Sequence, residues 1–264
     1  MLNSRLDAAD SAPKGKELYL IDYDSKDDGR VVIAMGNPDT AAHTGILVPG
    51  TNTSVEGVPG QLARIGKLQE AALNRSDGES VAMVSWIGYD APEASSSDFG
   101  SVGGTGRAEE AAPDLRRFVA GTHASHDGAP SHTTVMGHSY GSTVVGAAAA
   151  GGHGLGADDV VVVGSPGMTV HEASDLQMDP EHVWAGGAKD DPIINNFAGL
   201  TLGDDPLNAP FGGNNFEVDT SGHSGYWDDG SQSLDNQGSI IAASPPREVP
   251  KEVNEDPAPG TFIG

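Results

Sequence analysis

The sequence predicts an α/β protein, with helices on both faces of a mostly parallel β-sheet. The first observation is a hairpin-like pair of strands, residues 18–23 and 31–36, followed by strand-like runs that alternate with helix-like segments. This order is typical of parallel strands joined by helical crossovers. The second observation is that residues 80–86 and 159–164 are apolar almost throughout, which indicates strands buried on both faces.

The other elements follow from local patterns. Residues 58–75 place Leu62, Ile65 and Leu68 on one side of an amphipathic helix. Residues 87–105 and 199–222 are rich in Gly, Ser, Asn and Asp and are expected to be covering loops, and the segment 165–181 is too short for a large cap domain. Expected strands are 18–23, 31–36, 44–48, 80–86, 131–136, 159–164, 182–186 and a short one at 216–218, and expected helices are 58–75, 106–123, 142–150 and 231–243.

We expect one domain over residues 1–244, because 264 residues suffice for a single α/β domain with a large core. Residues 1–16 are polar and are expected to be loose or helical. Residues 245–264 contain five prolines and several charges, and we expect them to form a Pro-rich, acidic, disordered tail.

The composition excludes several kinds of site and partner. Cysteine is absent, so disulfides, thiolate metal sites and a cysteine nucleophile are excluded. The formal charge of −24 disfavours nucleic acid and membrane partners, and solubility or a high-salt or GC-rich background explains it without any partner. No membrane-spanning run or signal peptide is evident. We therefore expect a cytoplasmic protein, or a piece of a longer one, in an oligomeric state that the sequence does not indicate.

The pattern Gly137-His138-Ser139-Tyr140-Gly141 occurs once, between a β-branched run and a helix rich in small residues. A serine at a tight turn between strand and helix is typical of a nucleophile in a strained backbone conformation, and the two glycines allow strand and helix to approach closely. The alternative is a Gly/Ser-rich surface turn. The context favours Ser139 as a nucleophile.

Acyl transfer by serine requires a base and an acid that orients it. In serine hydrolases with this strand–turn–helix motif the order along the chain is Ser, then acid, then His. Of nine histidines, His223 alone follows the candidate acids, and it is therefore the preferred base; a surface loop histidine is the alternative interpretation. His138 is interpreted as a packing residue. Asp191 follows a strand end and precedes a proline, so it is the preferred acid; the alternatives are Asp190, Asp204, Asp205 and Asp219.

The oxyanion of such a reaction needs two N–H donors. One is the N–H of the residue after the nucleophile, Tyr140. The other is expected in the loop Pro49-Gly50-Thr51-Asn52 after the third strand, with Thr51 as the donor. A plain strand-terminating turn is the alternative interpretation of this loop.

Four short sequence segments resemble those of α/β-hydrolases, in particular the actinobacterial α/β-hydrolase domains classed as a domain of unknown function. They are residues 48–51, 86–92 (Trp-Ile-Gly-Tyr-Asp-Ala-Pro), 137–142 and 191–193, within about 30–230. The resemblance implies a serine hydrolase fold with a catalytic triad, and it supplies no substrate.

The leading hypothesis is a hydrolase that cleaves a small-molecule carboxylic ester through an acyl-enzyme on Ser139. Amides, thioesters and acyl transfer use the same machinery and stay open. The alternative from another class is a non-catalytic binding or toxin-associated domain with the same fold. No cofactor or metal is expected, since neither His-x-x-x-His nor His-x-His occurs.

Overall fold

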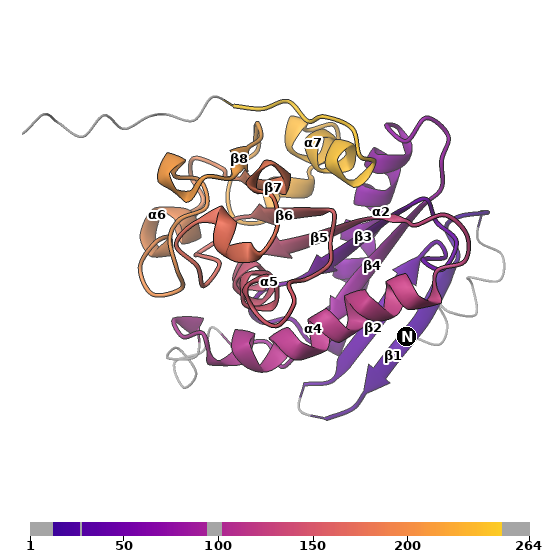
Figure 1. The fold of residues 1–264 in the computed structure, drawn as a ribbon, viewed down its shortest axis with the longest axis horizontal. Coiled ribbons are helices and arrows are strands. Elements are labelled where there is room, and N and C mark those ends of the chain that lie inside the picture. Colours follow the sequence, from indigo (N-terminus) through magenta and orange to yellow (C-terminus); the bar gives the residue numbers. More distant parts are fainter. Residues whose placement is uncertain (1–12, 27, 94–101, 250–264) are drawn as a thin grey trace, which may run out of the picture.

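The centre of the structure, a computed structural model describing residues 13–26, 28–93 and 102–249, is a twisted β-sheet. Among the described residues it has eight strands in the order β1-β2-β4-β3-β5-β6-β7-β8 (Figure 1). The strands are β1 (Leu18–Asp24), β2 (Arg30–Met35), β3 (His43–Val48), β4 (Val81–Ile87), β5 (His132–His138), β6 (Asp159–Val163), β7 (Val183–Gly186) and β8 (Asn214–Asn215).

Strand direction divides the sheet into two parts. β1 pairs with β2 and β2 pairs with β4, both antiparallel, so the expected hairpin forms one edge. From β4 to β8 all neighbours are parallel. The register of β3 with β5 places Val48 opposite Gly137. The loop after β3 and the turn after β5 therefore start side by side at the carboxyl edge of the sheet, where sites in open parallel sheets gather.

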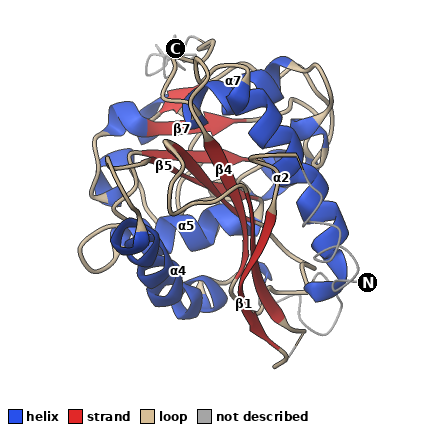
Figure 2. Cartoon of the chain, turned by 90° about the vertical axis from the view of Figure 1, so that its right-hand side faces the viewer, coloured by secondary structure: helices blue, strands red, loops and turns tan. Residues whose placement is uncertain are grey.

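Helices cover both faces of the sheet, as Figure 2 shows. α4 (Gly106–Ser125) and α5 (Tyr140–Ala150) lie on one face, and α2 (Val58–Leu73) and α7 (Gln232–Ile241) lie on the other. The short α6 (Pro192–Phe197) follows β7. α4 continues through Pro113. Short 3-10 turns are η1 (Val55–Gly57), η2 (Ala173–Leu176), η3 (Pro180–His182), η4 (Ala209–Phe211) and η5 (Gly225–Trp227).

Alternate residues of the strands fill two apolar layers, because successive side chains point to opposite faces of a sheet. In β2, Val32 and Ala34 belong to the layer under α4 and α5. Val31 and Ile33 of the same strand belong to the layer under α2 and α7. The predicted fold class is confirmed, since a mostly parallel sheet is covered on both faces.

The short strand predicted at 216–218 lies two residues earlier, as β8. Phe216 extends this pairing through its N–H, which donates to the carbonyl of Ala185 at 3.1 Å. The chain then turns to a different partner. The N–H of Glu217 donates to Arg247 at 3.0 Å, and the N–H of Val249 donates to Asn215 at 2.9 Å. Residues 215–217 therefore join the sheet on one side and the C-terminal segment on the other.

The expected boundaries of the domain stay predictions, but parts of both terminal segments that the structure describes contact distant residues. Residues 247–249 of the predicted tail hold the backbone hydrogen bonds just given, and residues 250–264 lie outside the described residues. In the predicted loose start, the carbonyl of Gly15 accepts the Gln69 side-chain amide at 2.6 Å, while residues 1–12 lie outside the described part. These contacts depend on distant partners, so local polarity did not reveal them. Residues 94–101 of the predicted covering loop are also outside it.

Candidate active site

Ser139 lies in the sharp turn between β5 and α5, with φ of 54° and ψ of −132°. A non-glycine residue in this region costs about 1–3 kcal/mol, which the surrounding structure must hold in place. A Cβ on Gly137 would lie 2.5 Å from the Cα of Ser142, and one on Gly141 would meet the carbonyl oxygen of Val48. The strand, turn and helix predicted around the motif are therefore present. Because Ser139 is only 5% exposed, the turn is not a surface turn.

Asp191 and His223 form a hydrogen-bonded pair beyond β7. Nδ1 of His223 lies 3.0 Å from Oδ1 and 2.9 Å from Oδ2 of Asp191. Asp191 is fully buried and caps α6 by accepting the N–H of Ile193 at 2.8 Å. Burial alone would raise the pKa of Asp191, but hydrogen bonds from His223, Tyr226 and Ile193 outweigh it and keep the pKa below its usual value. The ionised carboxylate favours the His223 tautomer that carries its proton on Nδ1, and in that tautomer Nε2 has a free lone pair.

Tyr226 is a third member of this hydrogen-bond network. Its hydroxyl donates to Oδ2 of Asp191 at 2.6 Å and accepts the N–H of Ala188 at 3.2 Å. Burial raises the pKa of Tyr226, so the hydroxyl stays protonated and remains a donor. The sequence analysis missed this residue, because nothing in its local sequence indicates which carboxylate it meets.

His138 does more than pack beside Ser139. Its Nε2 donates to the backbone carbonyl of His223 at 2.8 Å, and the two ring centroids are 4.7 Å apart. Burial, together with the neighbouring His223 ring, lowers the pKa of His138 to about 3. The ring is therefore neutral at physiological pH, and its proton holds the His223 backbone in place.

Ser139 and His223 line one cavity of ≈ 360 Å³. The other lining residues come from the loop after β3, from the N-terminal half of α2 and the residue before it, from the turn around His223 and from the end of β5. They are Gly50, Thr51, Asn52, Thr53, Gly57, Gly60, Gln61, Arg64, His138 and Ser224. The cavity thus contains the predicted nucleophile, the predicted base and the predicted oxyanion residue Thr51.

The loop after β3 lies directly against the turn that carries Ser139. A Cβ on Gly50 would lie 2.7 Å from the Cβ of Ser139 and 3.0 Å from the backbone nitrogen of Tyr140, so only glycine allows this approach. The N–H of Asn52 donates to the carbonyl of Pro92 at 3.1 Å. Among the described residues, none accepts the N–H of Thr51.

The segment 86–92 packs against this loop and hydrogen-bonds to it. Trp86 and Tyr89 are stacked, with ring centroids 6.1 Å apart and planes inclined by 11°. The Tyr89 hydroxyl donates to the carbonyl of Pro49 at 2.7 Å, and Asp90 forms an ion pair with Arg107 of α4. The segment therefore connects α4 to the loop that carries Thr51.

The alternative acids do not contact His223. Asp190 accepts the N–H of Gly222 at 2.8 Å, so it holds the backbone next to His223 and is more than a solvated turn residue. The remaining three bind elsewhere: Asp204 contacts the ring of His171, Asp205 accepts the N–H of Leu207, and Asp219 accepts N–H groups of Gln232 and Ser233 at the start of α7.

The two predicted covering loops touch each other where the structure describes them. The Thr201 hydroxyl donates to the carbonyl of Gly103 at 2.8 Å, and the Tyr140 hydroxyl donates to the carbonyl of Gly104 at 2.6 Å. Tyr140, the residue after Ser139, thus anchors the first loop through its side chain.

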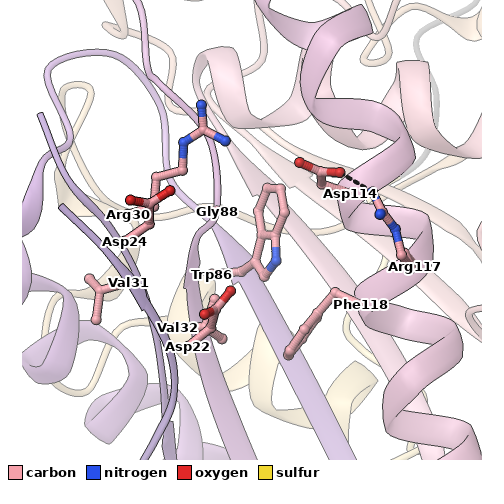
Figure 3. A pocket seen from close by; sticks show the side chains of 10 residues that line it. All are labelled: Asp22, Asp24, Arg30, Val31, Val32, Trp86, Gly88, Asp114, Arg117 and Phe118. Atoms are coloured by element: carbon pink, nitrogen blue, oxygen red, sulfur yellow. Dashed lines mark hydrogen bonds and ion pairs between the residues drawn. The ribbon is translucent and has the colours of Figure 1, made fainter. Parts of the chain in front are cut away.

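A second cavity of ≈ 380 Å³ lies between β1, β2, the end of β4 and α4 (Figure 3). Its lining includes Trp86, Phe118 and the ion pair of Asp114 with Arg117, and none of the predicted catalytic residues reaches it. Within the described ranges, no group of three or more His, Asp and Glu side chains is arranged to hold a metal ion. No helix in the same ranges combines the length and apolar character needed to cross a bilayer.

Comparison with known proteins identifies relatives that are similar to this chain in sequence. An uncharacterized Mycobacterium tuberculosis protein, Rv2079, is 32% identical over 91% of this chain, which spans 41% of that protein. The chain thus covers about two fifths of the length of this relative. The uncharacterized Mycobacterium bovis protein Mb0988c is 32% identical over 76% of each chain.

Solved structures with a similar fold include two esterases. The hyperthermophilic esterase from Pyrobaculum calidifontis has a TM-score of 0.54, with 11% identity over 92% of this chain and 90% of its own. The thermophilic carboxylesterase EstE1, from a metagenomic library, has a TM-score of 0.52, with 13% identity over 92% and 93%. The sequence model for the α/β-hydrolase family matches residues 24–201. The chain therefore belongs to the α/β-hydrolase family.

Proposed function

We propose that this α/β-hydrolase cleaves a carboxylic ester through an acyl-enzyme on Ser139, with His223 as base and Asp191 as the acid that orients it. The observation that carries the proposal is the pairing of a buried, ionised Asp191 with Nδ1 of His223. His223 itself lines the same cavity as Ser139. The esterase folds of the structural neighbours are consistent with it.

In the proposed first step, Nε2 of His223 takes the proton of the Ser139 hydroxyl while Oγ bonds to the carbonyl carbon of the ester. The positive charge that develops on the ring is stabilised by Asp191, whose carboxylate stays ionised throughout. His223 then gives the proton to the alcohol oxygen while the bond between that oxygen and the acyl carbon breaks, so the alcohol leaves and the acyl group stays on Ser139. A water molecule repeats the sequence on the acyl-enzyme, and the carboxylic acid leaves.

We propose the backbone N–H groups of Thr51 and Tyr140 as the oxyanion donors. The close contact of Gly50 with the Ser139 turn brings the two backbone segments together, and each such donor typically lowers the barrier by about 3 kcal/mol. A cavity of ≈ 360 Å³ suits a small-molecule substrate.

A fluorophosphonate probe combined with peptide mass spectrometry tests this proposal. We expect the label on Ser139, together with hydrolysis of 4-nitrophenyl butyrate. Ser139→Ala abolishes labelling and lowers turnover by about 10⁴-fold or more, because triad members act as a unit. Ser224→Ala is the matched control, since it removes another serine hydroxyl from the same cavity and leaves the label in place. Undiminished turnover in folded Ser139→Ala would exclude the serine mechanism.

A further inference from the structure

Arg64 of α2 is a half-buried cation that faces the same cavity as Ser139 and His223. Its guanidinium stacks over the Trp227 ring, 4.6 Å from the ring centroid. With the residues that the structure describes, Arg64 makes neither an ion pair nor a hydrogen bond. An arginine carries five N–H donors in a planar fork, so this side chain presents unused donors to the cavity.

The charge of Arg64 contrasts with the rest of the molecule. The chain has a formal charge of −24, yet none of the described residues lining this cavity is an aspartate or a glutamate. Arg64 is the permanently charged side chain among them. Burial lowers its pKa, because taking a cation out of water is unfavourable unless an anion compensates.

A second side chain of α2 faces the cavity without a partner. Gln61 lies one turn before Arg64 and is 6% exposed. Its buried amide oxygen has no hydrogen-bond donor among the described residues. Gly57 and Gly60, at the N-terminal end of α2, line the same wall, so the positive end of the helix dipole lies beside the cavity.

We propose that the substrate carries an anionic group, a carboxylate or a phosphate, which Arg64 binds while the ester lies at Ser139. The guanidinium fork supplies charge-assisted hydrogen bonds to the anion. The amide oxygen of Gln61 is an acceptor, so it does not bind the anion itself. The inference rests on the proposed function and adds the substrate class to it.

The test compares matched neutral and anionic esters, with rates corrected for spontaneous hydrolysis. Placing the charge on the acyl side, 4-nitrophenyl hydrogen glutarate is compared with 4-nitrophenyl hexanoate. On the leaving-group side, 4-acetoxybenzoate and 4-acetoxyphenyl phosphate are compared with methyl 4-acetoxybenzoate, which also separates carboxylate from phosphate. The quantity measured is the ratio of kcat/KM for the anionic ester to kcat/KM for its neutral partner.

We expect the ratio for at least one pair to fall tenfold or more in Arg64→Met and to be partly restored in Arg64→Lys, which keeps the charge without the planar fork. Arg117→Met is the control, because it removes one positive charge from the exposed surface of α4. Its ratio stays at the wild-type value. Equal ratios in wild type and Arg64→Met for every pair overturn the inference.

A binding measurement separates this inference from the proposed function. Isothermal titration calorimetry with monomethyl glutarate and with inorganic phosphate is carried out on wild type, Arg64→Met and Ser139→Ala. If no ester is cleaved and Ser139 is not labelled, the proposed function fails. Anion binding that persists in Ser139→Ala and is lost in Arg64→Met still supports the anion site, and binding of neither anion to wild type overturns it.

Discussion

Substituting asparagine at each of two adjacent aspartates separates the orienting acid from its neighbour. Asp191 receives three donors: Nδ1 of His223 at 2.9–3.0 Å, the hydroxyl of Tyr226 at 2.6 Å and the N–H of Ile193 at 2.8 Å. Asp190 receives the N–H of Gly222 at 2.8 Å. The same substitution therefore meets very different demands at the two positions.

Asparagine has one acceptor oxygen and one NH₂ group, so it cannot accept three donors as a carboxylate does. At position 191 the NH₂ faces at least one donor, and His223 is pushed toward the tautomer with its proton on Nε2. That tautomer cannot take the Ser139 proton, a defect that costs up to about 10⁴-fold, equivalent to about 5 kcal/mol of barrier. At position 190 the amide oxygen still accepts the Gly222 N–H. We expect Asp190→Asn to remain within about threefold of wild type, since one neutral hydrogen bond replaces a charge-assisted one.

The assay is kcat/KM on 4-nitrophenyl butyrate for both variants, with the Tm of each as a check on folding. Nitrogen NMR of the His223 ring supplies a second readout, because it reports which nitrogen carries the proton. The assignment of the acid is refuted if Asp190→Asn loses activity by orders of magnitude while Asp191→Asn stays near wild type. Similar, small losses in both would instead place the orienting acid elsewhere.

Three further predictions use other groups. His223→Ala lowers kcat/KM almost as far as Ser139→Ala, and the double variant is little worse than either; additive losses would show that the two act independently. Tyr226→Phe removes a donor from the acid, so the acid limb of the pH–rate profile moves to higher pH and kcat/KM falls by about tenfold; an unmoved limb would mean the hydroxyl only fills space. His132→Gln tests the ion pair of His132 with Asp159 at 3.0 Å: although burial opposes both charges, the pair raises the pKa of His132 and lowers that of Asp159. The stabilisation from this ion pair is present between about pH 4 and 6.5, fades as pH rises through the raised histidine pKa, and is lost in acid. The Tm of the variant should therefore lie further below that of wild type at pH 5.5 than at pH 9. A Tm difference that does not change with pH would contradict this.

Residues that are defined by their own neighbours in the chain could be predicted from the sequence. The turn at Ser139 needs glycines two residues before and after it, and a strand and a helix on either side, all of which can be seen within about fifteen residues. Asp191 lies where a strand ends before a proline, and it is the N-cap of α6, which is also a local signal. The parallel strands could be predicted for a similar reason, since apolar runs buried on both faces have few alternatives.

Residues whose roles depend on distant contacts could not be predicted in this way. The hydroxyl of Tyr226 is 35 residues along the chain from Asp191, and Nε2 of His138 binds a carbonyl 85 residues away. The periodicity of α2 identifies its apolar face, but Gln61 and Arg64 lie at the border of that face. Only the position of the cavity shows that these two side chains line the candidate site and do not pack into the core.

The proposed chemistry and the proposed recognition are carried by different kinds of structure, and this difference has consequences. Ser139 and the loop at Gly50 sit at the carboxyl ends of β5 and β3, where contacts below 3 Å would exclude a Cβ on the neighbouring glycines. A change there disturbs the backbone and hence the reaction. Arg64 and Gln61 project from one face of α2, where a side chain can be exchanged while the helix backbone stays in place. Substitutions on this face of α2 should therefore change which esters are accepted, without rebuilding the turn on which the proposed acyl transfer depends.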